Sequence, residues 1–324
     1  MKLEVIDLKK HFGDKEVLKG ISFTVENGQP LGLLGQNGAG KTTTIRTLMG
    51  IYDIEHGEIL LDGKPFNLGK ESVGYLPEER GLYQDIKVIE QLVYIAKLRG
   101  LSAKDAKRAS NNALAKLEIS HYADKLIKTL SKGNQQKVQL AQTIVHNPKI
   151  VILDEPFSGL DPVNSQILKD VILELIAANK IVIFSSHQMN FVEEFCKDIV
   201  IIKDGAVVLQ GDLEKIKQDL GGNRLVIKAN GDTNVDLVTK LHRLFGPTCE
   251  YKITPDDLIV TPTSALTKNE LISRIAQNDI DLRYVKMYEP SLHDIFVAKV
   301  GEDEPALPPQ PDLLDFCKHF GVEE

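Results

Sequence analysis

The stretch LLGQNGAGKTT at residues 33–43 constrains the fold of this chain more than any other feature. It fits the pattern G-x-x-x-x-G-K-[ST], with the apolar run LGLLG before it and the helix-like TTTIRTLMG at its end. Glycines let the backbone turn tightly and point its N–H groups at phosphate oxygens, and the N-terminus of a helix adds positive potential. The pattern therefore predicts a strand, a phosphate-binding loop and a helix in succession.

Two side chains of this loop have specific chemistry. Lys41 can reach the β- and γ-phosphates of a nucleotide, and the hydroxyl of Thr42 can ligate Mg²⁺. The whole set of candidate phosphate-binding residues is Gly35, Gln36, Asn37, Gly38, Ala39, Gly40, Lys41, Thr42 and Thr43.

The segment IVILDEP at residues 150–156 supplies a matching acidic pair. A buried strand here would deliver Asp154 at its C-terminal end, where α/β proteins place their sites. Asp154 would hold Mg²⁺ directly or through water, and Glu155 would polarise an attacking water. Two acids at a strand end can also simply cap the next helix, but the phosphate loop favours the catalytic interpretation.

Strand-like and helix-like segments alternate over residues 1–218, which predicts an α/β fold with a mostly parallel sheet. Short turns such as NGQP and DGKP predict an antiparallel β annex near the N-terminus. The composition changes near DLGGNRL, and residues 221–300 are predicted to form a small α+β domain.

Residues 301–324 contain seven acids and one lysine, and the segment GEDEPALPPQP is rich in proline. This composition predicts an extended or disordered tail. Within it, LLDFCKHF is either a short helix with an apolar face or a frayed end.

The bulk composition excludes several classes of protein. The formal net charge of −7 does not favour nucleic acid as a partner. No apolar run approaches the ~18 residues that span a bilayer, and no signal peptide is visible, so we expect a cytoplasmic protein. Cys196, Cys249 and Cys317 are far apart and are expected to be idle reduced thiols.

The stretch LSKGNQQ at residues 130–136 is small, polar and glycine-bearing. The hydroxyl of Ser131, the N–H of Gly133 and the start of a following helix would together form a second anion site. The simpler interpretation is an ordinary N-capped helix.

In their order along the chain, GQNGAGKTT, LSKGNQQ, VILDEP, SGLD and SSH resemble the motifs of ATP-binding cassette (ABC) transporter ATPases over residues 1 to about 215. The resemblance implies a P-loop ABC cassette with a helical signature subdomain, and ATP and Mg²⁺ as cofactors. It implies that two cassettes pack head to tail around two ATP molecules. Ser131, Gly133 and Gln135 would then contact the nucleotide that the partner's phosphate loop holds.

The resemblance assigns three further residues. His187 in IVIFSSHQM resembles the switch histidine that contacts the γ-phosphate and helps to orient the water. Asp161 in SGLDP resembles an acid that communicates between the two sites. Phe12 stands where the family stacks an aromatic ring on adenine, although an aromatic residue there could equally belong to the core.

The chain departs from the family at Glu78, where a glutamine is usual. A carboxylate can lie near Mg²⁺ through water, but it cannot donate a hydrogen bond. The form PEERGLY and the C-terminal extension, which ends near YEPSLHDIF, resemble exporter ATPases of the sodium-extrusion and drug-export branch.

The sequence therefore predicts the ATP-hydrolysing subunit of an exporter, which forms a dimer of identical copies on the cytoplasmic face of the membrane. Its separate transmembrane permease would contact residues 81–99. The alternatives are a soluble ABC ATPase of translation or DNA repair, and a regulator that binds ATP without hydrolysing it. The transported substrate is not written in the sequence.

Overall fold

The computed structural model describes residues 1–79, 81–263, 266–278 and 280–301. The predicted acidic tail from residue 302 onward, with LLDFCKHF and Cys317, lies outside the described residues. In the part described, every helix is too short or too polar to cross a membrane.

An antiparallel sheet lies at the N-terminal end of the chain, with strand order β2-β1-β4-β5. Buried and more exposed residues alternate along β1, so only one of its faces packs against the core. The annex predicted from the sequence is therefore confirmed. Its strands are β1 (Lys2–Phe12), β2 (Lys15–Glu26), β4 (His56–Leu61) and β5 (Lys64–Pro65).

The main sheet has the strand order β10-β9-β3-β8-β7-β6 and is parallel except for β10. Every residue of β3, β7 and β8 is buried, which explains their uninterrupted apolar sequences. The predicted, mostly parallel α/β core is confirmed. Its strands are β3 (Leu31–Gly35), β6 (Val73–Leu76), β7 (Ile150–Asp154), β8 (Ile181–Ser185), β9 (Asp198–Lys203) and β10 (Ala206–Asp212).

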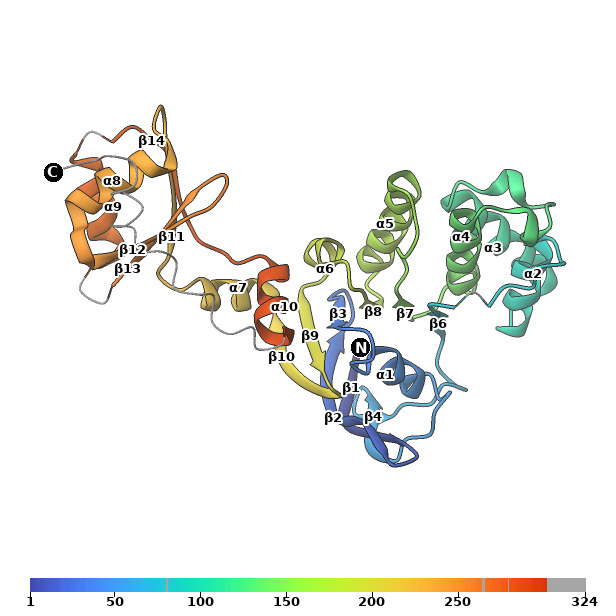
Figure 1. Cartoon of the computed structure of the whole chain (residues 1–324). Coiled ribbons are helices and arrows are strands. Elements are labelled where there is room, and N and C mark those ends of the chain that lie inside the picture. Colours follow the sequence, from blue (N-terminus) through green and yellow to red (C-terminus); the bar gives the residue numbers. More distant parts are fainter. Residues whose placement is uncertain (80, 264–265, 279, 302–324) are drawn as a thin grey trace.

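Helices surround this sheet, and α2, α3 and α4 form a separate helical lobe beyond β6 (Figure 1). We call this lobe the signature lobe, because its helix α4 begins directly after Ser131 in the stretch LSKGNQQ. The helices are α1 (Lys41–Leu48), α2 (Val88–Leu98), α3 (Ala103–Lys116), α4 (Lys132–Ile144), α5 (Pro162–Ala177) and α6 (Met189–Phe195), with short 3₁₀ turns at Ser120–Tyr122 and Ile127–Thr129.

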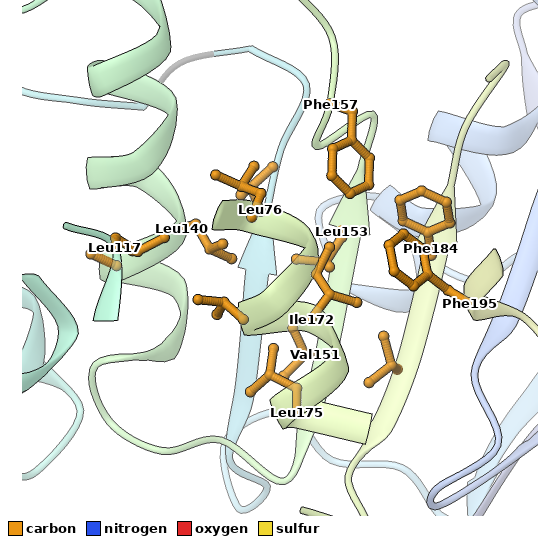
Figure 2. Packing of buried hydrophobic residues seen from close by; sticks show 14 of the residues in the cluster. Leu76, Leu117, Leu140, Val151, Leu153, Phe157, Ile172, Leu175, Phe184 and Phe195 are labelled. Atoms are coloured by element: carbon orange, nitrogen blue, oxygen red, sulfur yellow. The ribbon is translucent and has the colours of Figure 1, made fainter. Parts of the chain in front are cut away.

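Figure 2 shows the core beside the main sheet, where apolar side chains of β7, β8 and α5 meet. The ring of Phe157 lies 5.7 Å from that of Phe184 and 5.8 Å from that of Phe195. Phe157 follows the acidic pair by two residues, so its burial fixes the chain immediately after Glu155.

The C-terminal part of the chain contains a second antiparallel sheet, with strand order β12-β13-β11-β14 and its own hydrophobic core under α8 and α9. This is the predicted α+β arrangement. No sequence pattern predicted α6, α7 or β12. The elements are α7 (Leu213–Gly221), β11 (Leu225–Ala229), α8 (Asn234–Phe245), a 3₁₀ turn (Gly246–Thr248), β12 (Cys249–Ile253), β13 (Leu258–Pro262), α9 (Lys268–Ala276), β14 (Leu282–Met287) and α10 (Leu292–Val300).

The last helix, α10, returns to the N-terminal part of the chain and packs against α6 (Figure 1). Leu292, Ile295 and Val300 are buried in the same hydrophobic cluster as Phe195. The backbone N–H of Leu292 also donates to Oε1 of Glu193 at 2.6 Å. The boundaries at residues 218, 221 and 300 stay predictions, but α10 shares its core with the first region rather than with the second sheet.

Candidate functional site

The candidate site lies where β3, β6, β7 and β8 of the main sheet end. Because these strands are parallel neighbours, their carboxyl ends meet at one edge. The phosphate loop follows β3, Glu78 follows β6, the acidic pair ends β7, and His187 follows β8. The topology thus gathers residues that are far apart in the sequence.

The backbone of the phosphate loop requires glycine. Gly40 has a φ of 115°, and a Cβ atom added to it would lie 2.9 Å from Cδ2 of Leu18. A Cβ atom at Gly35 would lie 2.6 Å from the carbonyl oxygen of Ile202. Gly40 also precedes α1 as its N-cap and makes no side-chain capping bond, so the first turn of α1 presents its N–H groups to a phosphate.

Lys41 is buried, and its ammonium group donates to the carbonyl oxygens of Gly35 at 2.8 Å and of Gln36 at 3.3 Å. Burial lowers the pKa of Lys41, and the negative charges of Glu155, Asp154 and Glu78 oppose this shift. The ammonium group is thus held across the loop, where phosphate oxygens would replace the two carbonyl acceptors.

Asp154 is fully buried, and its Oδ1 atom accepts a hydrogen bond from the hydroxyl of Ser185 at 2.5 Å. Its Oδ2 atom is buried without a hydrogen-bond partner among the described residues. Burial raises the pKa of Asp154, while the bond from Ser185 opposes the shift. An unpaired buried carboxylate oxygen is costly by itself and fits a cation ligand.

These residues fit Mg²⁺ bound together with a nucleotide. No group of three or more His, Cys, Asp and Glu side chains in the described parts of the chain could hold a metal ion alone. Mg²⁺ commonly uses one or two protein ligands together with substrate phosphates and water. Asp154 and the hydroxyl of Thr42 at the start of α1 provide that kind of ligand set.

Glu155 has an unusual backbone conformation, with a φ of 51° in the left-handed region. Its N–H group lies 3.2 Å from both the carbonyl and the hydroxyl oxygen of Ser185. Its carboxylate oxygen Oε2 lies 2.8 Å from Nδ1 of His187. Strained backbone of this kind persists where the surroundings impose it, often at active sites.

Glu78 is exposed, yet its charge acts on both Asp154 and Lys41. Its charge helps to raise the pKa of Asp154, after the larger effect of burial, and the pairing of Leu76 with Leu153 puts the end of β6 beside the acidic pair. The structure therefore brings Glu78 into the same cluster as the acidic pair.

Phe12 lies at the end of β1, with 44% of its surface exposed, and so it is not a core residue. Its ring meets that of Tyr52 edge to face at 5.0 Å, and the Nζ atom of Lys10 lies 5.7 Å from its centre. Glu55 holds the adjoining backbone, because it accepts from Lys10 at 2.6 Å and from the N–H of His11 at 2.9 Å.

The predicted signature residues lie at the start of α4, in the signature lobe and away from α1 (Figure 1). Ser131 is the N-cap of α4 and accepts from the N–H of Asn134 at 3.3 Å. Gln135 bonds to the carbonyl oxygens of Ile127 and Leu130 within the same lobe. The cluster at the strand ends thus does not include Ser131, Gly133 or Gln135 of its own chain.

Asp161 is the N-cap of α5 and accepts from the N–H of Asn164 at 2.9 Å. That bond is the main cause that lowers the pKa of Asp161. The side chain of Asn164 also adjoins Gly133, since a Cβ atom built there would lie 3.0 Å from its Nδ2 atom. The loop that carries Asp161 therefore contacts the signature loop.

Sequence reasoning missed Ser185 and Tyr52. Ser185 holds the unpaired carboxylate in place, and it could have been noticed as a serine at the end of an apolar strand, next to His187. Tyr52 follows α1 at a distance of 40 residues from Phe12, and no local pattern links the two. Of the predicted idle thiols, Cys196 and Cys249 are free and buried.

The site combines a phosphate loop that requires glycine, a buried acid on the strand two places away in the sheet, and a charged cluster at the strand ends. This combination defines a P-loop nucleotide-binding protein. Two family models match the chain: an ABC transporter model over residues 18–158, and the C-terminal domain of DrrA1-3-like ATP-binding proteins over residues 211–300.

Individual proteins agree with these matches. The uncharacterized ABC transporter ATP-binding protein YhaQ of Bacillus subtilis is 38% identical over 92% of this chain and 98% of its own length. The linearmycin resistance ATP-binding protein LnrL of the same organism is 28% identical over 92% of this chain and 98% of its own length. A solved ATP-binding subunit of an ABC transporter is 30% identical, with a TM-score of 0.63 over 74% of this chain and 99% of the other. The chain belongs to the ABC transporter ATP-binding proteins.

Proposed function

We propose that the chain hydrolyses ATP as a subunit of an exporter, closes head to tail with a second copy around two ATP molecules, and drives a separate transmembrane permease. One observation carries the proposal. The buried, unpaired oxygen of Asp154 and the carboxylate of Glu155, whose backbone is strained, lie at one strand end, and both charges act on Lys41.

In this proposal the residues divide the chemistry between them. Lys41 and the N–H groups of the phosphate loop bind the phosphates, and Phe12 supports the adenine ring. Asp154 and Thr42 would hold Mg²⁺, which when bound neutralises charge on the phosphates. Glu155 accepts a proton from the attacking water, and His187 orients the carboxylate and meets the γ-phosphate.

The position of the signature residues supports the dimer. Ser131 and Gly133 lie in the signature lobe, and the strand-end cluster of the same chain does not include them. A helix N-terminus that begins with a serine hydroxyl suits an anion that another molecule supplies. A second copy of this chain, related by two-fold symmetry, would supply it.

The permease would bind residues 81–99, as the sequence predicts. Three large apolar side chains lie exposed there: Tyr83 at 60%, Tyr94 at 51% and Leu98 at 64%. Exposed apolar groups of this size mark interaction surfaces. A permease partner would place the chain on the cytoplasmic face of a membrane. The exporter direction is supported by the likeness to LnrL, whose name records resistance to linearmycin.

The experiment is the mass of purified Glu155→Gln in solution, by size exclusion with light scattering, with and without Mg-ATP. Removing the base should trap the ATP-bound dimer. Ser131→Arg in the same protein should abolish the dimer, because it blocks the second anion site. Glu174→Gln provides a matched control, since Glu174 lies on α5 and pairs with Lys116. A monomer at saturating Mg-ATP would contradict the proposed closure.

A soluble ABC ATPase of translation or DNA repair is the second candidate. It is disfavoured by the net charge of −7, and ATPase activity that rises on addition of nucleic acid would support it instead. A regulator that binds ATP without hydrolysis would show no turnover that depends on Glu155.

A further inference from the structure

One face of α4 carries a row of buried polar side chains. Gln136, Gln139 and Thr143 are spaced by three and four residues, and they are 4%, 1% and 3% exposed. Polar side chains with so little exposure normally bond to a specific partner.

All three bond to backbone carbonyl groups at the ends of the catalytic strands. Gln136 donates to the carbonyl of Pro156, directly after the acidic pair, at 3.2 Å. The hydroxyl of Thr143 lies 3.2 Å from the carbonyl oxygen of Tyr75 in β6 and 2.9 Å from that of Gln139 in its own helix, so its one proton is shared between them. This buried row thus connects the signature lobe to β6 and β7.

Gln139 makes the most specific of these connections. Its Nε2 atom lies 2.8 Å from the carbonyl oxygen of Pro77 and 3.3 Å from that of Glu79. These two carbonyls flank Glu78, so one amide group holds the backbone on both sides of it. The Oε1 atom of Gln139 is buried with no hydrogen-bond partner among the described residues, a cost that an apolar residue of similar volume would avoid.

We propose that Gln139 is a positioning residue for ATP hydrolysis, which fixes Glu78 to the helix that begins at Ser131. The inference rests on the proposed function, because α4 moves only if Ser131 and Gly133 engage a partner's nucleotide. A displacement of α4 then shifts Glu78 relative to Asp154 and Lys41. In this proposal Gln139 acts through the backbone on either side of Glu78.

The first test is a double-mutant cycle in steady-state ATPase activity of the full chain. Gln139→Met keeps the volume and removes both donors, and it should lower kcat by about ten-fold while KM for Mg-ATP changes by less than about two-fold. In a Glu78→Ala background the same substitution should have almost no further effect, because two residues that act as one unit are not additive. An unchanged kcat, or an equal loss in both backgrounds, would overturn the proposal.

Gln142→Met is the matched control. Gln142 lies on the same helix, and its side chain bonds to Gln91 of α2 rather than to the Glu78 segment. It should leave kcat within about two-fold of the wild type. If Gln139→Met does not fold, Gln139→Glu takes its place in the cycle, because it has the same shape and replaces the donors by acceptors.

A second measurement separates this proposal from the proposed function. The chain contains no tryptophan, so Tyr83→Trp places a single fluorophore in the segment that follows Glu78. In Glu155→Gln protein, Mg-ATP should shift its emission when Gln139 is present and not in Gln139→Met. A wild type without ATPase activity would refute the proposed function. The fluorescence of this reporter would still show whether Gln139 couples α4 to the segment that contains Glu78. An emission shift that persists in Gln139→Met, or no shift in either protein, would overturn the proposed role of Gln139.

Discussion

The Nδ1 atom of His187 lies 2.8 Å from the Oε2 atom of Glu155, and the two side chains differ sharply in exposure, at 57% and 8%. The histidine thus reaches from the surface to a carboxylate that is otherwise enclosed. Because the backbone of Glu155 has a φ of 51°, its carboxylate cannot be placed by an ordinary strand conformation. His187 therefore helps to determine where the proposed base points.

Replacing His187 should impair chemistry and leave nucleotide binding intact. For His187→Ala we expect kcat to fall by about 100-fold, because a general base loses its orienting partner. The Kd for ATP should change by less than about three-fold, since Lys41 and the phosphate loop carry binding. Steady-state ATPase assays and nucleotide titration measure the two quantities. His121→Ala, an exposed histidine in the signature lobe, is the control. An equal loss in kcat and affinity would argue for a binding role.

Asp154→Asn should separate stability from activity. Burial raises the pKa of Asp154 above its ordinary value, so the ionised carboxylate destabilises the folded chain at neutral pH. The neutral amide should therefore raise the free energy of unfolding at pH 7 by about 1 kcal/mol, while ATPase activity falls by at least about 100-fold.

Chemical denaturation in the absence of nucleotide tests this at two pH values. The gain should shrink as pH falls from the raised pKa of folded Asp154 towards the ordinary pKa of the unfolded chain, because in that window the folded wild type binds a proton that the unfolded chain does not. A variant that is clearly less stable than the wild type at pH 7 would contradict the argument.

The aromatic pair at the end of β1 predicts how the base of the nucleotide is held. Phe12→Ala should weaken ATP binding by roughly ten-fold, which corresponds to about 1.4 kcal/mol of stacking energy. Phe12→Trp should retain the affinity for ATP, because the indole ring still offers an aromatic face on which adenine can stack. Titration with ATP measures both. If Tyr52→Ala weakens binding and Phe12→Ala does not, the adenine support has been assigned to the wrong ring.

His146 predicts a dependence of stability on pH. Its pKa is lowered to about 4, mainly by burial and then by the charge of Arg99. Between about pH 6.5 and pH 4 the unfolded chain therefore binds a proton that the folded chain does not. Stability should fall by about 3 kcal/mol as pH decreases through this window. The comparison of His146→Leu with wild type isolates the effect, and His293→Gln, an exposed histidine on α10, should keep the wild-type slope.

Much of the fold was predictable because its signals are local. The strands β3, β7 and β8 are uninterrupted apolar runs, and the phosphate loop has a pattern that only a strand, a turn and a helix satisfy. By contrast, α6 and α7 are short helices of seven and nine residues, and helices of this length depend on packing for their stability. The position of α10 also depends on tertiary packing, since no pattern in its sequence predicts that it joins the hydrophobic cluster that contains Phe195.

The same distinction holds for the site. The sequence alone determined which residues are candidates for the chemistry, because Lys41, Asp154 and Glu155 lie in patterns that span a few neighbouring positions. The tertiary structure decided what surrounds them. Ser185 bonds to one oxygen of Asp154 while the other has no partner among the described residues, and Gln139 donates to backbone carbonyls on both sides of Glu78. These contacts join residues that are 31 and about 60 positions apart. Contacts at such separation arise only when strands and helices pack, and a local pattern cannot encode them.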